Sequence, residues 1–125
     1  MYNDGIKILA IGNSFSMDAM CYLPDLLCQL GMDESGITLI NAAIGGCGLE
    51  THALNAESDK RAYLREVFRG NGEIEEPETL YSIKELIREN AWDVITLQQV
   101  SGDAGKADTY GGDLQYMIKY VKNTQ

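Results

Sequence analysis

The sequence is poor in basic residues and in histidine. Its 125 residues include 10 Lys and Arg against 19 Asp and Glu, which gives a formal net charge of −9, and its one histidine is His52. Nucleic-acid binding needs Lys and Arg to displace counterions from phosphates, and anionic membrane surfaces attract basic segments. We therefore expect neither a nucleic acid nor a membrane among the partners of this protein.

Long apolar runs are also missing. None approaches the roughly 20 residues that cross a bilayer, and the first five residues lack the basic and apolar regions of a signal peptide. The sequence as written predicts a cytoplasmic protein. If a signal has been removed, a secreted or periplasmic location is predicted instead.

Cysteine is scarce, and its three positions, Cys21, Cys28 and Cys47, are an odd number without close spacing. This pattern argues against a disulfide framework and against a zinc site. We expect packed, reduced thiols, with no metal and no cofactor.

Three apolar segments alternate with helix-like segments along the chain. Apolar runs of this kind predict strands buried on both faces, and strand–helix alternation predicts parallel strands with crossover helices. We therefore expect a single α/β domain over residues 1–125, with a three-layer α/β/α arrangement, a short parallel sheet and a flavodoxin-like topology. The predicted strands are residues 6–11, 37–41 and 92–97, and the predicted helices lie within residues 17–30, 78–90 and 113–122.

Two stretches are less regular. Pro24 suits the first turn of a helix, so the first helix is expected to begin near Tyr22, with residues 17–21 as a loop. Residues 49–77 are expected to form an irregular insertion. Within it, residues 59–68 fit either a helix or a hairpin that closes at Gly70-Asn71-Gly72.

Each predicted strand ends in a loop of small polar or glycine residues, namely Gly12-Asn13-Ser14, Gly45-Gly46 and Gln98-Gln99. Parallel strands bring their carboxyl ends to one edge of the sheet, where open α/β sheets place their chemistry. A hydroxyl nucleophile beside backbone and amide N–H donors is the set that ester cleavage requires. The three loops therefore predict an acyl-transfer site.

These loops resemble the sequence blocks of the SGNH (GDSL-type) hydrolases. Residues 11–16, Ile-Gly-Asn-Ser-Phe-Ser, resemble the first block, with Asn13 in place of its usual Asp, and residues 41–46 resemble the second. Residues 93–101 stand at the third block, where the Gln-Gln pair resembles a subgroup of SGNH-like domains. The resemblance implies a serine esterase that acts on an acyl ester of a small molecule or a carbohydrate. It assigns Ser14 as nucleophile, the Ser14 and Gly46 amides as oxyanion donors, and Gln98 or Gln99 as the third donor.

The Asp-x-x-His block of that family has no counterpart in this sequence. The chain thus resembles the N-terminal portion of an SGNH domain, and we expect it to be inactive or weakly active alone. His52 is a candidate replacement base, although a lone histidine in a polar stretch is more often a solvated or hydrogen-bonded loop residue. An incomplete sheet edge also predicts self-association.

Two other classes of function remain open. One is a non-catalytic fragment or binding module that keeps the hydrolase-like fold. The other is a flavodoxin-like phosphate or nucleotide binder that uses the Ser14 turn at a helix N-terminus. Against the second, the sequence has neither a G-x-G-x-x-G motif nor a P-loop lysine.

Overall fold

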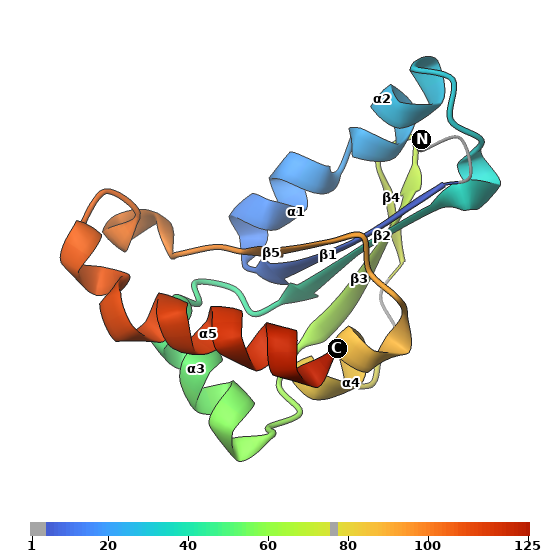
Figure 1. Ribbon diagram of the computed structural model, residues 1–125. Helices are drawn as coiled ribbons and strands as arrows, with labels where there is room; N and C mark the ends of the chain where they lie inside the picture. The colour runs from blue at the N-terminus through green and yellow to red at the C-terminus, as the bar shows by residue number, and fades with distance from the viewer. Residues whose placement is uncertain (1–4, 76–77) are drawn as a thin grey trace.

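A five-stranded sheet in the order β4-β3-β2-β1-β5 forms the centre of the molecule (Figure 1). The computed structural model describes residues 5–75 and 78–125. Strands β1 (Ile6–Gly12), β2 (Ile37–Ala43) and β5 (Val94–Leu97) are parallel. Strands β3 (Leu64–Gly70) and β4 (Glu73–Glu75) extend the sheet in the antiparallel direction.

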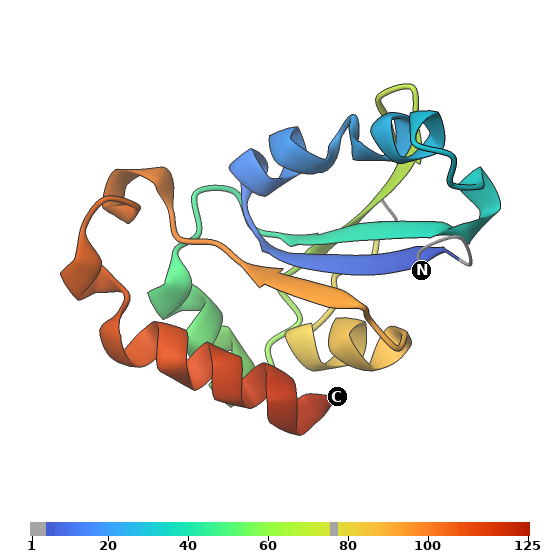
Figure 2. The ribbon, with the colours of Figure 1, turned by 45° about the horizontal axis from the view of Figure 1, so that its top comes forward.

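Helices cover both faces of this sheet, as Figure 2 shows, so the predicted three-layer α/β/α fold is confirmed. Helices α1 (Ser14–Met20) and α2 (Leu23–Gln29) lie on one face. Helices α3 (Leu49–Ser58), α4 (Ile83–Glu89) and α5 (Gly111–Thr124) lie on the other. The two central strands are therefore buried on both sides, which is why their sequences are continuously apolar.

Alternate residues of the central strands pack in two separate hydrophobic cores on opposite faces of the sheet. Leu9 and Ile11 of β1 pack with Ile40 of β2 in the larger core, which α3, α4 and α5 close. Ala10 and Leu39 face the other way, into the smaller core beneath α1 and α2. The alternation follows from the two-residue period of a strand.

The expectation of an irregular insertion over residues 49–77 is wrong. Its first part is α3, and residues 64–75 form the β3–β4 hairpin, which is one of the two alternatives that the sequence left open; residues 76–77 lie outside the described residues. Asn71 and Gly72 have positive φ angles of 55° and 75°. These are the values that a two-residue hairpin turn of the Asn-Gly type requires.

The expectation of a loop over residues 17–21 is also wrong. A first helix, α1, already begins at Ser14, and Pro24 lies in the first turn of a second helix, α2. The proline divides the segment into two short helices because its ring is tolerated in a first turn but not in a helix interior. The sequence pattern showed only the second helix.

The predicted helix over residues 78–90 is shorter in the structure. Helix α4 starts at Ile83, where Ser82 and Glu85 form a reciprocal capping box. Pro77, expected to precede this helix, lies outside the described residues. Within residues 5–75 and 78–125, no helix is long and apolar enough to cross a membrane.

Candidate functional site

Ser14 is the first residue of α1 and is exposed at the carboxyl end of β1. The preceding residue, Asn13, caps the helix: its Oδ1 accepts a hydrogen bond of 2.9 Å from the backbone N–H of Phe15. The Ser14 hydroxyl makes no hydrogen bond with any residue that the structure describes. The turn therefore holds the backbone of Ser14 while leaving its side chain free.

A network of buried polar side chains holds this turn in place on its buried side. The Ser16 hydroxyl accepts from the backbone N–H of Asn13 (3.0 Å) and lies 2.8 Å from the side-chain oxygen of Asn41 on β2. The Asn41 amide in turn donates to Glu66 Oε1 of β3 at 2.9 Å. Asn13, Asn41 and Glu66 are each at least 95% buried. Because buried polar groups are costly to leave unpaired, these bonds constrain how the serine turn sits on three neighbouring strands.

The same network holds the glycine loop against the serine turn. Asn13 Nδ2 donates to the carbonyl oxygen of Cys47 at 3.1 Å, and the Ile44 N–H donates to the Gly12 carbonyl at 3.3 Å. The loop from Ile44 to Cys47 is a tight turn closed by the Cys47 N–H and the Ile44 carbonyl, 3.2 Å apart. Gly46 has a φ of +69° within it, a conformation that favours glycine. The Gly46 N–H bonds to none of the described residues, so it is free for a ligand beside Ser14.

Gln98, at the end of β5, lies over the serine turn. A Cβ atom built on Gly12 would lie only 2.9 Å from Gln98 Oε1 and 2.4 Å from Ser16 Oγ, so a glycine is needed there for close approach. The Gln98 Oε1 atom is buried and has no hydrogen-bond partner among the described residues. The Gln98 Nε2 atom makes no hydrogen bond with a described residue and is not among the buried unpaired atoms, so it is the atom of this amide that can donate an N–H to a ligand.

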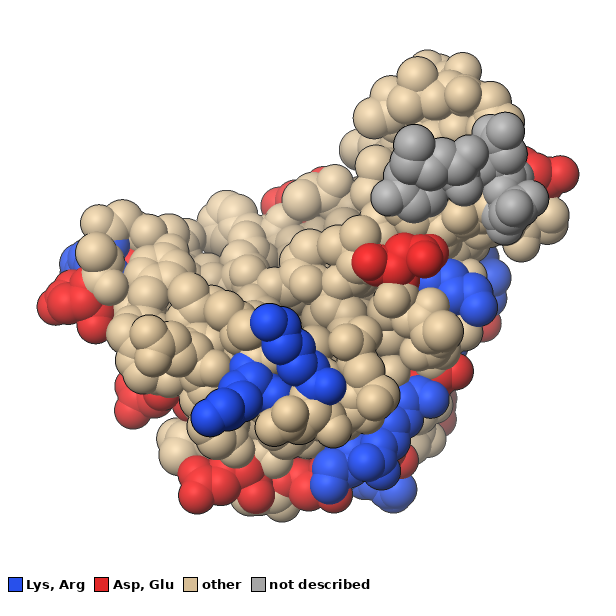
Figure 3. All heavy atoms as spheres, in the orientation of Figure 1, with Lys and Arg blue, Asp and Glu red and all other residues tan. Residues whose placement is uncertain are grey.

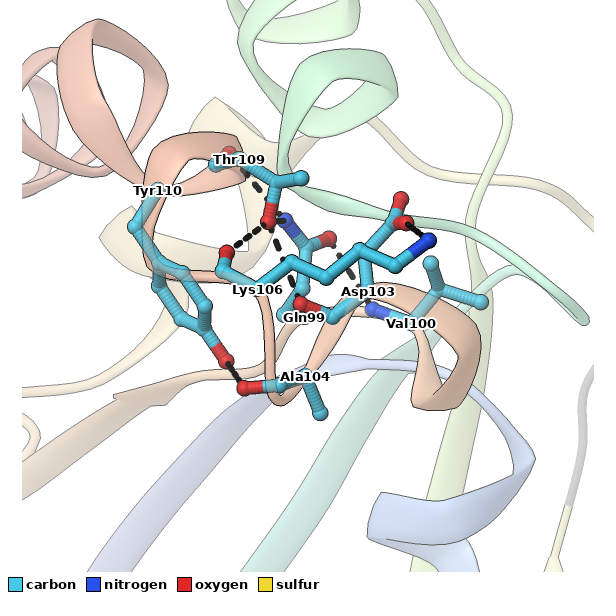
Figure 4. Close-up of polar contacts among 7 residues, drawn as sticks. All are labelled: Gln99, Val100, Asp103, Ala104, Lys106, Thr109 and Tyr110. Carbon is cyan, nitrogen blue, oxygen red and sulfur yellow. Dashed lines mark hydrogen bonds and ion pairs between the residues drawn. The ribbon is translucent and has the colours of Figure 1, made fainter.

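Gln99 has a different environment. Its Oε1 accepts from the backbone N–H of Leu49 at 2.9 Å. Figure 4 shows its other bonds: Oε1 also accepts from the Val100 N–H at 3.0 Å, and Nε2 donates twice to Thr109 at 3.2 Å. The side chain thus joins the end of β5 to the start of α3 and to the following loop. Both donor hydrogens are engaged, so Gln98 is the glutamine whose amide remains available to a ligand.

An open hollow of about 400 Å³ lies between the start of α1 and the loop that follows β5. Phe15, Leu97, Gln98 and Tyr110 are among its lining residues. The Tyr110 hydroxyl donates to the Ala104 carbonyl at 2.7 Å, which fixes one wall (Figure 4). Phe15, which follows Ser14 in the chain, is 53% exposed and lines this hollow, so the hollow reaches to within one residue of Ser14.

His52 is hydrogen-bonded, which is one of the two expected alternatives, but it lies on a helix in the core, so the expected loop position is wrong. It is fully buried on α3, its Nδ1 lies 2.7 Å from the Tyr63 hydroxyl and 3.6 Å from Cys47 Sγ, and its ring stacks on Tyr63. Burial lowers the pKa of His52 to about 4, so the imidazole is neutral at pH 7. His52 forms no hydrogen bond with Ser14, and this burial argues against its role as the base.

All three cysteines are free thiols, but the expectation that they are packed is wrong for Cys28, which is exposed, while Cys21 is half-buried and Cys47 is buried. In the described part of the chain, no group of three or more His, Cys, Asp or Glu side chains is arranged to hold a metal ion. Burial also raises the pKa of the Cys47 thiol, which keeps it protonated beside the glycine loop. Among the described residues, the unpaired groups at this edge include the Ser14 hydroxyl and the Gly46 N–H.

Comparison with protein families identifies the family of this chain. Residues 7–125 match the family described as a domain of unknown function, DUF4886. The chain belongs to the DUF4886 family. No curated protein matches this DUF4886 chain.

A solved structure is also similar to this DUF4886 chain. The crystal structure of a DUF4886 family protein from Bacteroides uniformis shares 36% sequence identity with it at a TM-score of 0.78. The match covers 97% of this chain and 46% of that protein. The chain thus spans about half the length of its solved relative.

Sequence reasoning placed Ser14, Gly46 and the glutamine pair at one sheet edge, and the structure brings the three loops to that edge. It missed the residues that hold them there, namely Asn13 as a cap and Asn41 and Glu66 as its buried partners. The sequence signal for this network was Asn41, an asparagine near the end of an apolar strand. A polar residue in such a strand needs a partner, which points to a buried network.

Replacement of Asn13 by Ala should lower the free energy of unfolding by about 2–4 kcal/mol. Loss of the helix cap accounts for about 1 kcal/mol, and the buried groups left unpaired account for about 1–3 kcal/mol. Urea denaturation measures the change. Asp33→Ala is a matched control, because Asp33 caps a three-residue helix at an exposed site, and it should cost about 0.5 kcal/mol. Equal losses in the two variants would contradict the account.

Burial of neutral His52 predicts a pH dependence of stability. The folded-state pKa of about 4 lies below the ordinary value of 6.5, so the unfolded chain binds the proton first as the pH falls. The free energy of unfolding should therefore decrease between about pH 6.5 and pH 4, by about 3 kcal/mol from this group. Denaturation at several pH values, with His52→Gln as the non-titrating control, isolates the effect. An identical pH dependence in the two proteins would show that His52 is not protected from protonation.

Proposed function

We propose that this DUF4886 domain is an ester hydrolase of the SGNH type that acts through an acyl-serine intermediate on Ser14. The observation that carries the proposal is the free, exposed Ser14 hydroxyl on a turn that Asn13 ties to the Gly46 loop and that has Gln98 close to Gly12. The Ser14 hydroxyl, the Gly46 N–H and the Gln98 amide each lack a hydrogen-bond partner among the described residues. A site whose polar groups are held in place but unpaired is suited to bind a reacting polar group.

The proposed reaction begins with attack of Ser14 Oγ on the carbonyl carbon of an ester. The carbonyl π electrons move to the oxygen, and a base takes the hydroxyl proton. The N–H groups of Ser14 and Gly46 and the Gln98 amide would stabilise the resulting oxyanion, at about 3 kcal/mol for a donor of this kind. The C–O bond to the alcohol then breaks, the alcohol leaves with a proton, and water later hydrolyses the acyl-serine.

The general base is the catalytic group that this chain does not supply well. His52 is its one histidine, and it is buried against Tyr63 rather than paired with Ser14. A serine without a base is a weak nucleophile at neutral pH. We therefore expect the 125-residue chain to turn over esters slowly or not at all, while Ser14 keeps enough reactivity to be labelled by a strong electrophile.

An acyl ester of a small molecule or a carbohydrate is the proposed substrate class. The open hollow beside Ser14 has aromatic and apolar walls in Phe15, Leu97 and Tyr110, which suits an apolar or ring-shaped group next to the ester. The strongly acidic chain disfavours polyanionic substrates. A binding module with the same fold would use the same hollow without forming a covalent bond.

A fluorophosphonate should label Ser14, with formation of a P–O bond and loss of fluoride. Intact-mass and peptide mass spectrometry should locate one adduct on the tryptic peptide that contains Ser14. Ser14→Ala should abolish the adduct, whereas Ser101→Ala, which removes an exposed serine from the same hollow, should leave it unchanged. Absence of labelling would favour the binding module, and an adduct that survives Ser14→Ala would refute the assignment of the nucleophile.

Substitution of Gln98 by Leu should reduce the rate of phosphonylation about 10²-fold, because one oxyanion donor is lost. The melting temperature should change little, since the Gln98 amide has no partner among the described residues. Gln99→Leu should lower the melting temperature instead, because it breaks three hydrogen bonds that join Gln99 to Leu49 of α3 and to Thr109. Mass spectrometry of samples quenched at successive times gives the rate of phosphonylation, and thermal denaturation gives the melting temperature, so the two effects are measured separately. If Gln98→Leu labels at the parent rate, Gln98 is not an oxyanion donor.

A further inference from the structure

A second group of buried polar side chains contacts the glycine loop through Cys47. Its Sγ lies 3.6 Å from Nδ1 of His52, and that nitrogen lies 2.7 Å from the Tyr63 hydroxyl. The Asn55 amide donates to the same hydroxyl at 3.4 Å. Figure 3 shows Lys, Arg, Asp and Glu side chains at the surface of the molecule, whereas His52 and Tyr63 are fully buried. The cluster consists of neutral groups, so hydrogen bonds rather than ion pairs hold it together.

The start of α3 brings His52 to the loop. Gly48 precedes this helix, and its carbonyl accepts from the His52 N–H at 3.2 Å. Side chains of a helix lean toward its N-terminus, which brings the imidazole to Cys47. Tyr63 lies just before β3, where its backbone exchanges two hydrogen bonds of 3.0 Å with Tyr81. Its hydroxyl therefore reaches His52 from a fixed backbone.

The contacts also assign the protons of this pair. Because the Asn55 amide donates to the Tyr63 hydroxyl, the hydroxyl hydrogen is available to Nδ1 of His52. Nδ1 is then the acceptor, and Nε2 carries the proton of the neutral imidazole. The Nε2 atom is buried and has no partner among the described residues. An unpaired buried N–H costs stability, so packing alone does not explain a histidine at this position.

We infer that His52 and Tyr63 are positioning residues for the glycine loop and act on it through Cys47. Within residues 45–48, this cysteine is the only residue that has a side chain. It is buried, and its Sγ lies 3.5 Å from the Gly48 carbonyl oxygen as well as 3.6 Å from His52. The pair thus holds the one side chain by which this part of the loop can be gripped.

The backbone of Cys47 transmits this constraint to the turn. Its N–H closes the turn onto the Ile44 carbonyl at 3.2 Å, and its carbonyl accepts from Asn13 at 3.1 Å. Gly46, the residue before it, presents the N–H assigned above as an oxyanion donor. The effect of the pair on catalysis rests on the proposed function, whereas its effect on the position of the loop does not.

Tyr63→Phe is the least disruptive test, because it removes one hydroxyl and keeps both rings. It should shift the NMR resonance of the Gly46 amide and slow phosphonylation of Ser14 about ten-fold, since the donor is displaced rather than lost. Ser82→Ala, which removes the side-chain cap of α4, is the control for loss of stability alone. It should lower the melting temperature and leave both the resonance and the rate unchanged.

Substitutions of His52 separate its hydrogen bond from its bulk. His52→Leu should act like Tyr63→Phe on the resonance and the rate. His52→Asn, which keeps an amide oxygen near the place of Nδ1, should retain the parent resonance and most of the parent rate. In a Cys47→Ala chain, where the link to the loop is cut, His52→Leu should change neither readout further.

An unchanged Gly46 resonance in both Tyr63→Phe and His52→Leu would overturn the inference. So would an effect of His52→Leu that is equally large in the Cys47→Ala chain. The same resonance shifts are expected in a Ser14→Ala background, because they do not require a reactive serine. If the fluorophosphonate labels neither the parent chain nor any variant, the proposed function fails, and the resonance still decides the role of the pair.

Discussion

The buried side chain of Asn13 is the constraint on which the rest of the site depends. Its oxygen caps α1, and its nitrogen reaches 3.1 Å to the Cys47 carbonyl in the glycine loop. Through Ser16 and Asn41 it is also tied to β2 and to Glu66 on β3. One amide thereby sets both the start of the helix and the position of the neighbouring turn. The free Ser14 hydroxyl and the free Gly46 N–H follow from that arrangement.

Such a network is effective because it is buried. In a low-dielectric interior each unpaired polar group is costly, so only the arrangement that satisfies Asn13, Asn41 and Glu66 together is stable. Ser14, one residue further on, stays at the surface with no partner among the described residues. The fold thus concentrates its hydrogen bonds beneath the site and leaves the groups that face the hollow free.

Much of this architecture could be predicted from the sequence because it depends on local signals. Apolar runs predicted the three parallel strands, and glycine and glutamine loops at their ends predicted the edge that carries Ser14, Gly46 and Gln98. The network was missed because its members lie 25 or more residues apart and meet only in the folded sheet. The burial of His52 was missed for a similar reason: its partner Tyr63 comes from beyond the end of α3.

The sheet edge and the site also belong together. Strand β5 at the edge of the sheet is bordered by a hollow on each face. Gln98 lines both the hollow on the α1 face and the hollow beside Phe15. The edge strand and the site therefore share this side chain.

The most direct test of the central claim is a crystal structure of the chain after reaction with a fluorophosphonate. The account predicts a phosphonyl group on Ser14 Oγ, with its oxygen about 2.7–3.1 Å from the N–H groups of Ser14 and Gly46 and from the Gln98 side-chain nitrogen. The Asn13 contacts to Phe15 and Cys47 should be unchanged. An adduct whose oxygen points to solvent, away from Gly46 and Gln98, would contradict the claim that this turn is an oxyanion site.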